Sequence, residues 1–362
     1  MRARSHGDDD LPLGVPLAEI AESVCELGQR EAIVEDGLHR ILCFGHVWVV
    51  LAISVHLPFC KRPWALPILL RLYRSKKRCS QKGWPYTKKT ELARQMLDVL
   101  ATWVADRRVE VVADSAYCNA TVTKGLGANV VLFGSMRPDA ALTAPPQPST
   151  KRRGGRPRIR GERLPKPEEV FKTARHGWYA TELLMYRRKQ VVTYQSWTAQ
   201  WYRACGGRLL RIVLVMTGTG DVPFRVFFCT DPDVPVWYLL QRYACRWSIE
   251  VTFFDLKQYL GFGDSQAWTQ KAVERTAPFA AYLFTIIVTW FATAASGSSL
   301  DVWPVRPWYL NKQAPSFQDM LGAAQRAALL SGVFDPASNS NNLHNTFSLA
   351  AFRRATPRRK AA

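Results

Sequence analysis

Two acidic residues occupy positions where a carboxylate could do chemistry. Asp114 directly follows the apolar run VEVVA, and open α/β sheets bind their ligands at the carboxyl ends of such strands. On that position alone, a turn residue or helix cap is the commoner role for an Asp. Glu250 lies within the segment YLLQRYACRWSIEVTFFDLKQYLG, which is apolar and aromatic enough to be a buried helix. A carboxylate flanked by cations in such a helix could hold a divalent metal ion near a phosphate.

Glu250 shares a helical face with other polar residues. Tyr243 and Arg246 precede it and Lys257 follows it, all within about 60° on a helix that advances about 100° per residue. Ordinary pairs at i, i+4 spacing on a solvated face would give the same pattern. A solvated face rarely includes a Tyr among so many aromatic residues, however, so the pattern favours a packed helix. Asp255 lies off this stripe, and we expect it to be exposed.

The segments around these residues predict a mixed α/β sheet. A strand over 109–113, a short helical crossover and a strand over 128–134 have the order of a parallel pair. Pro67 would be accepted most easily in an edge strand. The other predicted elements are a hairpin joining 32–35 to 38–57 through Asp36-Gly37, a strand over 64–72, a helix over 90–106 capped by Thr90, strands over 208–218 and 224–230, and a long helix over 235–260.

Basic residues dominate two stretches. The chain has 49 Lys and Arg against 29 Asp and Glu, and a net charge of +20 favours nucleic acid or an anionic membrane as partner. Residues 71–89 hold eight basic residues and no acid, interleaved with aromatic residues, and 151–163 hold seven basic residues and one Glu. A solvated basic loop would have the same composition, but such cations can also neutralise phosphates. The candidate DNA contacts in these stretches are Lys76, Lys77, Arg78, Arg152, Arg153, Arg156 and Arg158.

Composition narrows the class of protein. An apolar fraction of 48% excludes a disordered chain, and the length of 362 residues predicts two or three domains. The eight cysteines include no CxxC pair, which favours buried free thiols over disulfides or zinc. The N-terminus lacks the apolar core of a signal peptide. Residues 276–295 are apolar enough to span a membrane, but a helix in the core of a large protein has the same composition. We therefore expect no membrane partner.

The polar residues of the 235–260 segment match a known family. Tyr243-x2-Arg246-x3-Glu250-x6-Lys257 resembles, position for position, the YREK signature of DDE transposases of the insertion-sequence four superfamily. CFGHVWVVLAISV, VVADSAY and the Pro- and Arg-rich segment after residue 138 resemble the insertion-sequence 701 group. The resemblance extends over residues 24–295.

This resemblance implies an RNase H-like mixed sheet with flanking helices, interrupted by a β-rich insertion. In that family an acidic triad binds two Mg²⁺ or Mn²⁺ ions, which promote in-line attack of water or a 3′-hydroxyl on a DNA phosphodiester. Asp114 and Glu250 would be the second and third catalytic, metal-binding residues. Arg246 and Lys257 would contact phosphates of insertion-sequence ends, supported by Tyr243. The resemblance also implies strand cleavage and transfer, target DNA as a second partner, a homo-oligomer on DNA, and a cytoplasmic, nucleoid-associated location in bacteria.

The family's first aspartate has no recognisable counterpart. It normally ends an apolar strand ahead of FGHVWVV, whereas the acidic cluster Asp8–Asp10 follows the polar segment MRARSHG. We therefore expect an N-terminally truncated chain whose first strand is missing or degenerate and whose two-metal catalysis is severely impaired. The alternative is a non-catalytic DNA-binding protein derived from a transposase. The expected divisions are a degenerate segment over 1–30, core over 31–137, loop and insertion over 138–232, core with the glutamate helix over 233–296, and a basic extension over 297–362.

Overall fold

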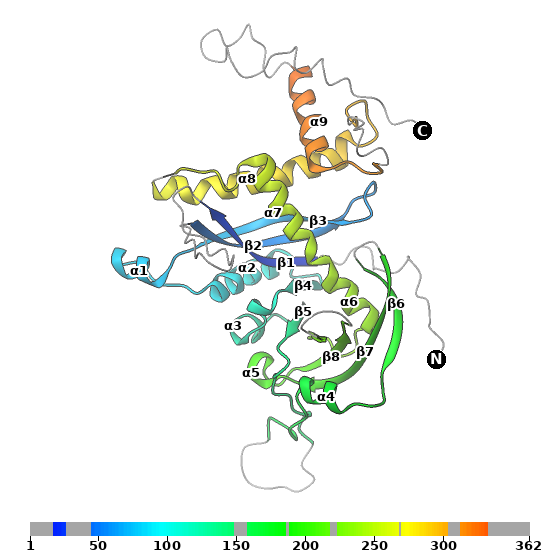
Figure 1. The fold of residues 1–362 in the computed structure, drawn as a ribbon. Helices are drawn as coiled ribbons and strands as arrows, with labels where there is room; N and C mark the ends of the chain where they lie inside the picture. The colour runs from blue at the N-terminus through cyan, green and yellow to red at the C-terminus, as the bar shows by residue number, and fades with distance from the viewer. Residues whose placement is uncertain are drawn as a thin grey trace, which may run out of the picture. The chain divides into compact units, whose positions relative to one another are not determined.

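The chain folds as an α/β protein built on one mixed sheet (Figure 1). The computed structural model describes residues 17–26, 45–147, 158–185, 188–217, 223–267, 269–302 and 312–331. The strands are β1 (Leu17–Glu26), β2 (Gly45–His56), β3 (Pro63–Tyr73), β4 (Val109–Ala113), β5 (Val130–Met136), β6 (Tyr179–Met185), β7 (Arg188–Gln200), β8 (Leu209–Met216) and β9 (Phe224–Cys229). The helices are α1 (Lys76–Lys82), α2 (Lys89–Trp103), α3 (Ala120–Thr123), α4 (Pro167–Thr173), α5 (Tyr202–Cys205), α6 (Val236–Cys245), α7 (Trp247–Leu260), α8 (Gln270–Trp290) and α9 (Phe317–Leu330), with short helical turns η1 (Ser115–Tyr117) and η2 (Phe291–Ala295).

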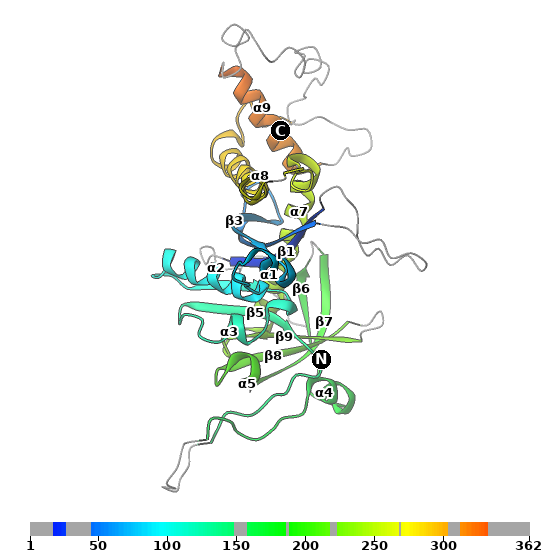
Figure 2. The same cartoon turned by 90° about the vertical axis from the view of Figure 1, so that its left-hand side faces the viewer.

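The described strands follow the order β3-β2-β1-β4-β5-β9-β8-β7-β6 across the sheet. β4 is parallel to β1 and β5, while β2 is antiparallel to β1 and β9 is antiparallel to β5. All five residues of β4 are buried, as expected of a central strand covered on both faces. Beyond β5, the strands β9, β8, β7 and β6 continue the same sheet (Figure 2). The predicted α/β fold class, a mixed sheet with flanking helices, is confirmed, and β6 to β9 lie in the residue range predicted as a β-rich insertion.

Helices cover the two faces of the sheet with separate hydrophobic clusters. On one face, Val111 and Leu132 pack with the buried side of α2, which includes Met96 and Leu100. On the opposite face, residues of β4, β5 and β9 pack against α6, where Leu239 is fully buried. The carboxyl end of β4 therefore lies between two helical layers, and the residue that follows the strand is held from both sides.

The expectation of a missing first strand is wrong. β1 occupies the place between β2 and β4, with Leu17 paired to Glu110 and Ile20 paired to Ala113. Its apolar residues at 17, 20 and 24 recur at helical spacing, so periodicity alone does not indicate a strand. Hydrogen-bonding partners on both sides override that local pattern, because β1 satisfies backbone groups of β2 and β4 that would otherwise be unpaired.

Several predicted boundaries also differ. The expected long helix is interrupted at Arg246, whose amide donates to the carbonyl of Tyr243 rather than four residues back. α2 begins at Lys89 and is capped through Lys88 and Glu91 instead of Thr90. The predicted hairpin segment over 32–35 lies outside the described residues. The pairs β4–β5 and β8–β9 and the edge position of β3, which contains Pro67, agree with the predictions.

The chain divides into two compact units, one comprising Met1–Val55 and Trp64–Phe253, the other His56–Pro63 and Phe254–Ala362. The second unit contains α8 and α9, and Phe284 of α8 packs on Phe317 of α9 with ring centres 4.5 Å apart. α9 is a regular helix that the sequence analysis did not predict. Gln270–Ala295 has the length and apolar composition of a membrane span, and core helices of large proteins share both properties. This division reflects compactness, so the domain boundaries expected from the sequence stay predictions.

Candidate functional site

Asp114 lies at the carboxyl end of β4, as the sequence indicates. Its Oδ1 accepts a hydrogen bond of 2.7 Å from the amide of Ser115 and so caps the short turn η1. The capping role and an active-site role are compatible, since Oδ2 accepts no hydrogen bond from the residues that the structure describes. Asp114 is half-buried, so this oxygen remains accessible to a ligand.

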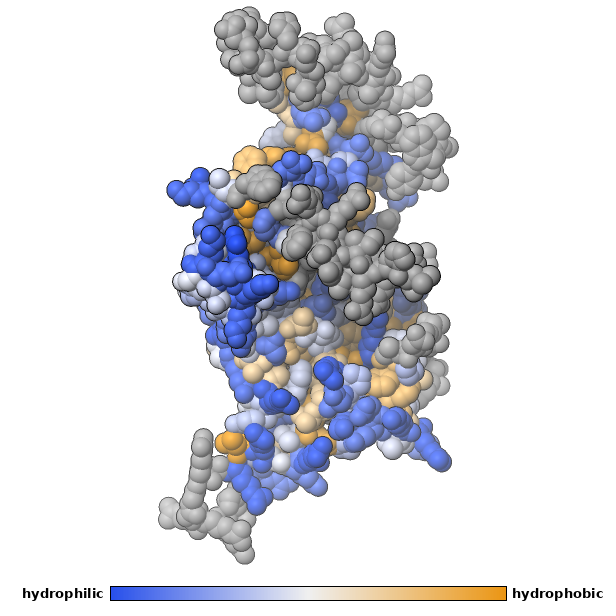
Figure 3. Space-filling view, turned by 60° about the vertical axis from the view of Figure 1, so that its left-hand side comes forward, coloured by the Kyte–Doolittle hydropathy of each residue, from blue (hydrophilic) through white to orange (hydrophobic). Residues whose placement is uncertain are grey.

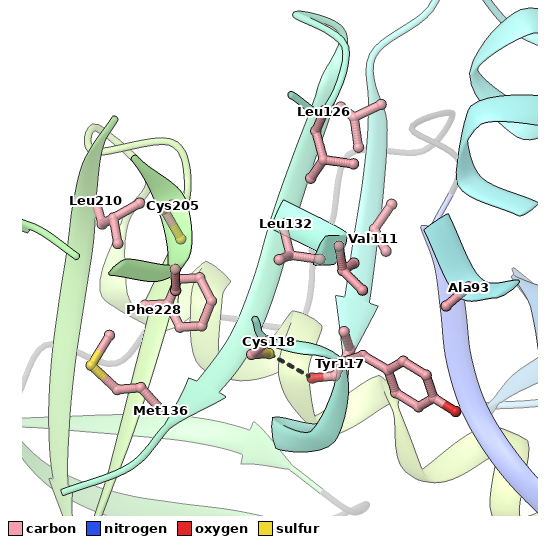
Figure 4. Packing of buried hydrophobic residues seen from close by; sticks show 14 of the residues in the cluster. Ala93, Val111, Tyr117, Cys118, Leu126, Leu132, Met136, Cys205, Leu210 and Phe228 are labelled. Carbon is pink, nitrogen blue, oxygen red and sulfur yellow. Dashed lines mark hydrogen bonds between the residues drawn. The ribbon is translucent and has the colours of Figure 1, made fainter. Parts of the chain in front are cut away.

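Cys118 packs among the buried hydrophobic residues next to β4 and β5 (Figure 4). The Cys118 thiol donates to the carbonyl oxygen of Asp114 at 3.3 Å. A Cβ at position 134 would lie 2.3 Å from that sulfur, so only glycine allows the thiol to pack against β5. Burial also raises the pKa of the Cys118 thiol far above its usual range, which makes this cysteine a packing group rather than a nucleophile.

Arg246 and Glu250 form an ion pair at the start of α7. Nη1 of Arg246 lies 3.0 Å from Oε1 of Glu250, and the two side chains are 20% and 38% exposed. Nε of Arg246 is buried and has no hydrogen-bond partner among the described residues. The first turns of α7 are fixed on the sheet because the Thr252 hydroxyl donates to the carbonyl oxygen of Ala65 in β3 at 2.8 Å. The guanidinium therefore projects from an anchored helix and retains an unused donor.

The Arg246 guanidinium brings the two acidic positions together. Burial alone would lower the pKa of Arg246, but the Tyr243 hydroxyl and the carboxylates of Asp114 and Glu250 raise it above its ordinary value. Both carboxylates thus act on the same guanidinium, although they come from segments 136 positions apart (250 − 114). The ion pair of Arg246 with Glu250 therefore lies within electrostatic range of the Asp114 carboxylate at the end of β4.

Tyr243 connects α6 to the strand beside Asp114. Its hydroxyl donates to Oγ of Ser135 in β5 at 3.2 Å, and its ring centre lies 4.7 Å from that of Phe227. Burial raises the pKa of Tyr243, while the hydrogen bond to Ser135 and the charge of Arg246 oppose that rise. Tyr243 is therefore a neutral group that holds the helix near the site.

Lys257 and Asp255 behave differently from the other residues of this segment. Lys257 is exposed on the part of α7 that belongs to the second unit, and its role as a DNA contact stays a prediction. The expectation of an exposed Asp255 is wrong: its side chain is 7% exposed, and burial raises its pKa to about 6, with Arg62 acting in the opposite direction.

The sequence analysis missed a buried charge network between β4 and α6. Glu110 and Arg242 are 2% and 4% exposed, and Nε of Arg242 lies 2.8 Å from Oε2 of Glu110. The Tyr238 hydroxyl donates to the same oxygen at 2.7 Å. The available signal was a Glu inside the otherwise apolar run VEVVA. This network fixes the strand that ends at Asp114 against the helix that leads to Arg246.

The two basic stretches are only partly described. Lys76, Lys77 and Arg78 lie on α1, where all three are exposed. Arg158 is also exposed, whereas Arg152, Arg153 and Arg156 lie outside the described residues. Arg160 stacks on Tyr202, with Cζ 3.9 Å from the ring centre.

The described residues do not complete a two-ion metal centre. Within the described ranges, no three His, Cys, Asp or Glu side chains gather where they could hold a metal ion. Asp114 and Glu250 are the two carboxylates that act on Arg246 among the residues whose side chains the structure describes, and Arg246 compensates part of their charge. We therefore derive no catalytic step through a metal ion.

Comparison with known proteins agrees with a nuclease-type site. Residues 43–204 match a family described as DDE superfamily endonuclease, a range that includes Asp114 and ends before Glu250. No curated protein matches the chain. A cryo-EM structure of the piggyBac transposase synaptic complex with hairpin DNA is similar at a TM-score of 0.41 and 13% identity, covering 92% of this chain and 59% of that one. A similarity this remote carries no argument about fold or function. The family match, over residues 43–204, supports an endonuclease of the DDE superfamily as the class of that segment.

Proposed function

We propose that this chain is a transposase-type protein of the DDE class that binds DNA at the end of β4. Asp114 and Glu250 are then the remaining carboxylates of a site that cleaves phosphodiesters. The observation that carries this proposal is the convergence of both carboxylates on Arg246, from segments far apart in sequence. By resemblance, the chain belongs to the insertion-sequence four superfamily and the 701 group, and its DNA is an insertion-sequence end.

Arg246 would be the group that recognises the DNA backbone. A guanidinium presents several donors in a fork that suits phosphate, and the buried Nε of Arg246 has none of its bonding capacity used among described residues. A phosphate that approaches Arg246 would also approach Asp114 and Glu250, so it would replace the carboxylates as the partner of the guanidinium. The carboxylates would then be released beside the scissile phosphate.

Divalent ions supply Lewis-acid activation in DDE endonucleases, and Asp114 and Glu250 would be the protein ligands of such an ion here. A pair of carboxylates holds a single divalent ion more readily than it holds two ions. We therefore propose that cleavage is weak, while DNA binding is retained. DNA binding without any cleavage is the second candidate function, favoured because no third metal-binding side chain joins Asp114 and Glu250 within the described residues.

One experiment separates these functions. The chain is incubated with supercoiled plasmid carrying the DNA that flanks its gene, in Mg²⁺ and in Mn²⁺, and nicking is measured alongside DNA binding. Asp114→Asn and Glu250→Gln are compared with Asp139→Asn, which removes an exposed carboxylate paired with Arg137 on the same unit. We expect slow nicking, reduced at least tenfold by either site variant and unchanged by the control, with DNA binding preserved in all three.

Nicking that persists in both site variants would refute the assignment of Asp114 and Glu250. Binding without nicking in the unaltered chain would establish the second candidate function. Loss of binding in Arg246→Gln, with no loss in Arg137→Gln, would support Arg246 as the phosphate contact.

A further inference from the structure

A second cationic surface lies on α1, separate from the carboxylate site. Four side chains of this short helix, Lys76, Lys77, Arg78 and Lys82, are exposed, and in the described part of the chain none of them forms an ion pair. Hydrophilic residues are gathered on the face of the molecule that carries α1 (Figure 3). Elsewhere on this unit some exposed arginines are paired, as Arg137 is with Asp139 at 3.0 Å.

The helix that presents these cations is firmly held. The Cys79 side chain is 2% exposed and anchors α1 to the unit. Ser75 caps the start of the helix by accepting from the amide of Arg78 at 3.3 Å. At the end, Gly83 adopts a left-handed conformation with φ of +67°, and its amide donates to the last turn of the helix. Because the backbone is fixed, binding an anion costs only the ordering of side chains.

The aromatic residues beside α1 support cations rather than offering open ring faces. Arg74 stacks on Trp84 with Cζ 5.0 Å from the ring centre, and Nζ of Lys89 lies 5.1 Å from the centre of Tyr73. Tyr73 also meets Tyr86 edge-on, with the two hydroxyl oxygens 3.3 Å apart. Rings engaged in this way hold positive charge near the surface and are poorly placed to stack on unpaired bases.

We infer that α1 and the adjoining residues up to Lys89 form a binding surface for the phosphate backbone of duplex DNA. This inference extends the proposed function, since it adds a second DNA contact to the one at Arg246. Duplex DNA presents one negative charge for about every 1.7 Å of its axis, which matches a compact cluster of unpaired cations better than a single strand does. Backbone contacts of this kind give affinity without sequence preference.

The test measures how DNA affinity depends on salt. Binding of a 30-base-pair duplex of arbitrary sequence is followed by fluorescence anisotropy from about 50 to 300 mM NaCl, for the full chain and its variants. Lys76→Ala/Lys77→Ala is compared with Arg107→Ala/Arg137→Ala, which removes two exposed, acid-paired cations from the same unit. We expect the slope of log K against log salt to flatten by about 1.8 in the α1 variant, at roughly 0.9 per phosphate contact, and to stay unchanged in the control.

A single strand of the same length and Tyr86→Ala complete the experiment. Tighter binding to duplex than to single strand, with Tyr86→Ala altering neither, supports the inference. An unchanged slope in the α1 variant, or a loss of single-strand binding in Tyr86→Ala, overturns it. The proposed function is judged separately, because Arg246→Gln in the same assay reports on the carboxylate site even if α1 makes no contact.

Discussion

Removing one partner of the buried pair between Glu110 and Arg242 should destabilise the fold strongly. In Arg242→Met, the Glu110 carboxylate would stay at 2% exposure and lose the guanidinium 2.8 Å away. The carboxylate would keep its hydrogen bond from the Tyr238 hydroxyl. It would also keep the longer ion pair with Arg108, whose Nε lies 3.6 Å from Oε1 of Glu110. Breaking a buried pair on one side costs about 3–5 kcal/mol, and the remaining contacts favour the lower end, about 3 kcal/mol.

Removing both charges should cost much less. Replacing a buried pair by apolar residues of similar size is often neutral, so Glu110→Leu/Arg242→Met should lose about 1 kcal/mol or less. If each single variant loses about 3 kcal/mol, the two single variants and the double variant define a coupling free energy of about 5 kcal/mol. The exposed pair Arg137–Asp139 is the matched control, and its coupling should fall below about 1 kcal/mol.

The assay monitors unfolding in urea by circular dichroism. The free energy of unfolding of each variant is calculated with one common m value, the slope of free energy against denaturant concentration. If the double variant loses as much as the sum of the single variants, Glu110 and Arg242 are not energetically coupled and the reasoning fails. If the double variant is stable, its DNA affinity becomes informative. The pair joins β4 to α6, so misplacement of Asp114 relative to Arg246 should weaken DNA binding even when the fold is intact.

Two further predictions concern residues near or beyond the site. Because burial raises the pKa of Asp255 to about 6 from 3.8, the folded state holds its proton more tightly than the unfolded state. The free energy of unfolding should therefore fall as pH rises from about 4 to 6, and Asp255→Asn should recover up to about 3 kcal/mol at pH 7.5 and little at pH 4, measured by urea unfolding. Gly134→Ala should lose about 1–3 kcal/mol through its clash with the Cys118 thiol. Gly134→Ala/Cys118→Ala should regain most of that loss, and a double variant no better than the single one would contradict this packing account.

Short apolar runs made much of the sheet predictable. VEVVA gives a strand over the predicted residues, because five buried positions in a row suit a central strand covered on both faces. The pair β8 and β9 was predictable from two runs joined by a short connection. Asp114 could be located because it ends the first of these strands, and ligands gather at such ends.

Tertiary contacts decided the features that the sequence did not reveal. β1 has helical periodicity and is a strand because β2 and β4 lie on either side of it. Asp255 has the spacing of an exposed residue, yet its side chain is buried, which a helical wheel of one isolated helix does not predict. The break at Arg246 depends on a single backbone hydrogen bond, for which periodicity contains no signal.

Because β1 completes the sheet, the stability of the fold and the ability to catalyse a reaction depend on different features of the chain. A strand between two partners is held by backbone hydrogen bonds, which any residue except proline can make, so the sheet closes whatever side chain lies level with Asp114. Catalysis instead needs particular side chains beside Asp114 and Glu250. Under the proposed function, a site that is short of one metal ligand leaves the sheet, the helices and the ion pair of Arg246 with Glu250 intact. A protein built this way should fold and bind DNA normally while cleaving it poorly, which is the combination that the nicking and binding assays are designed to detect.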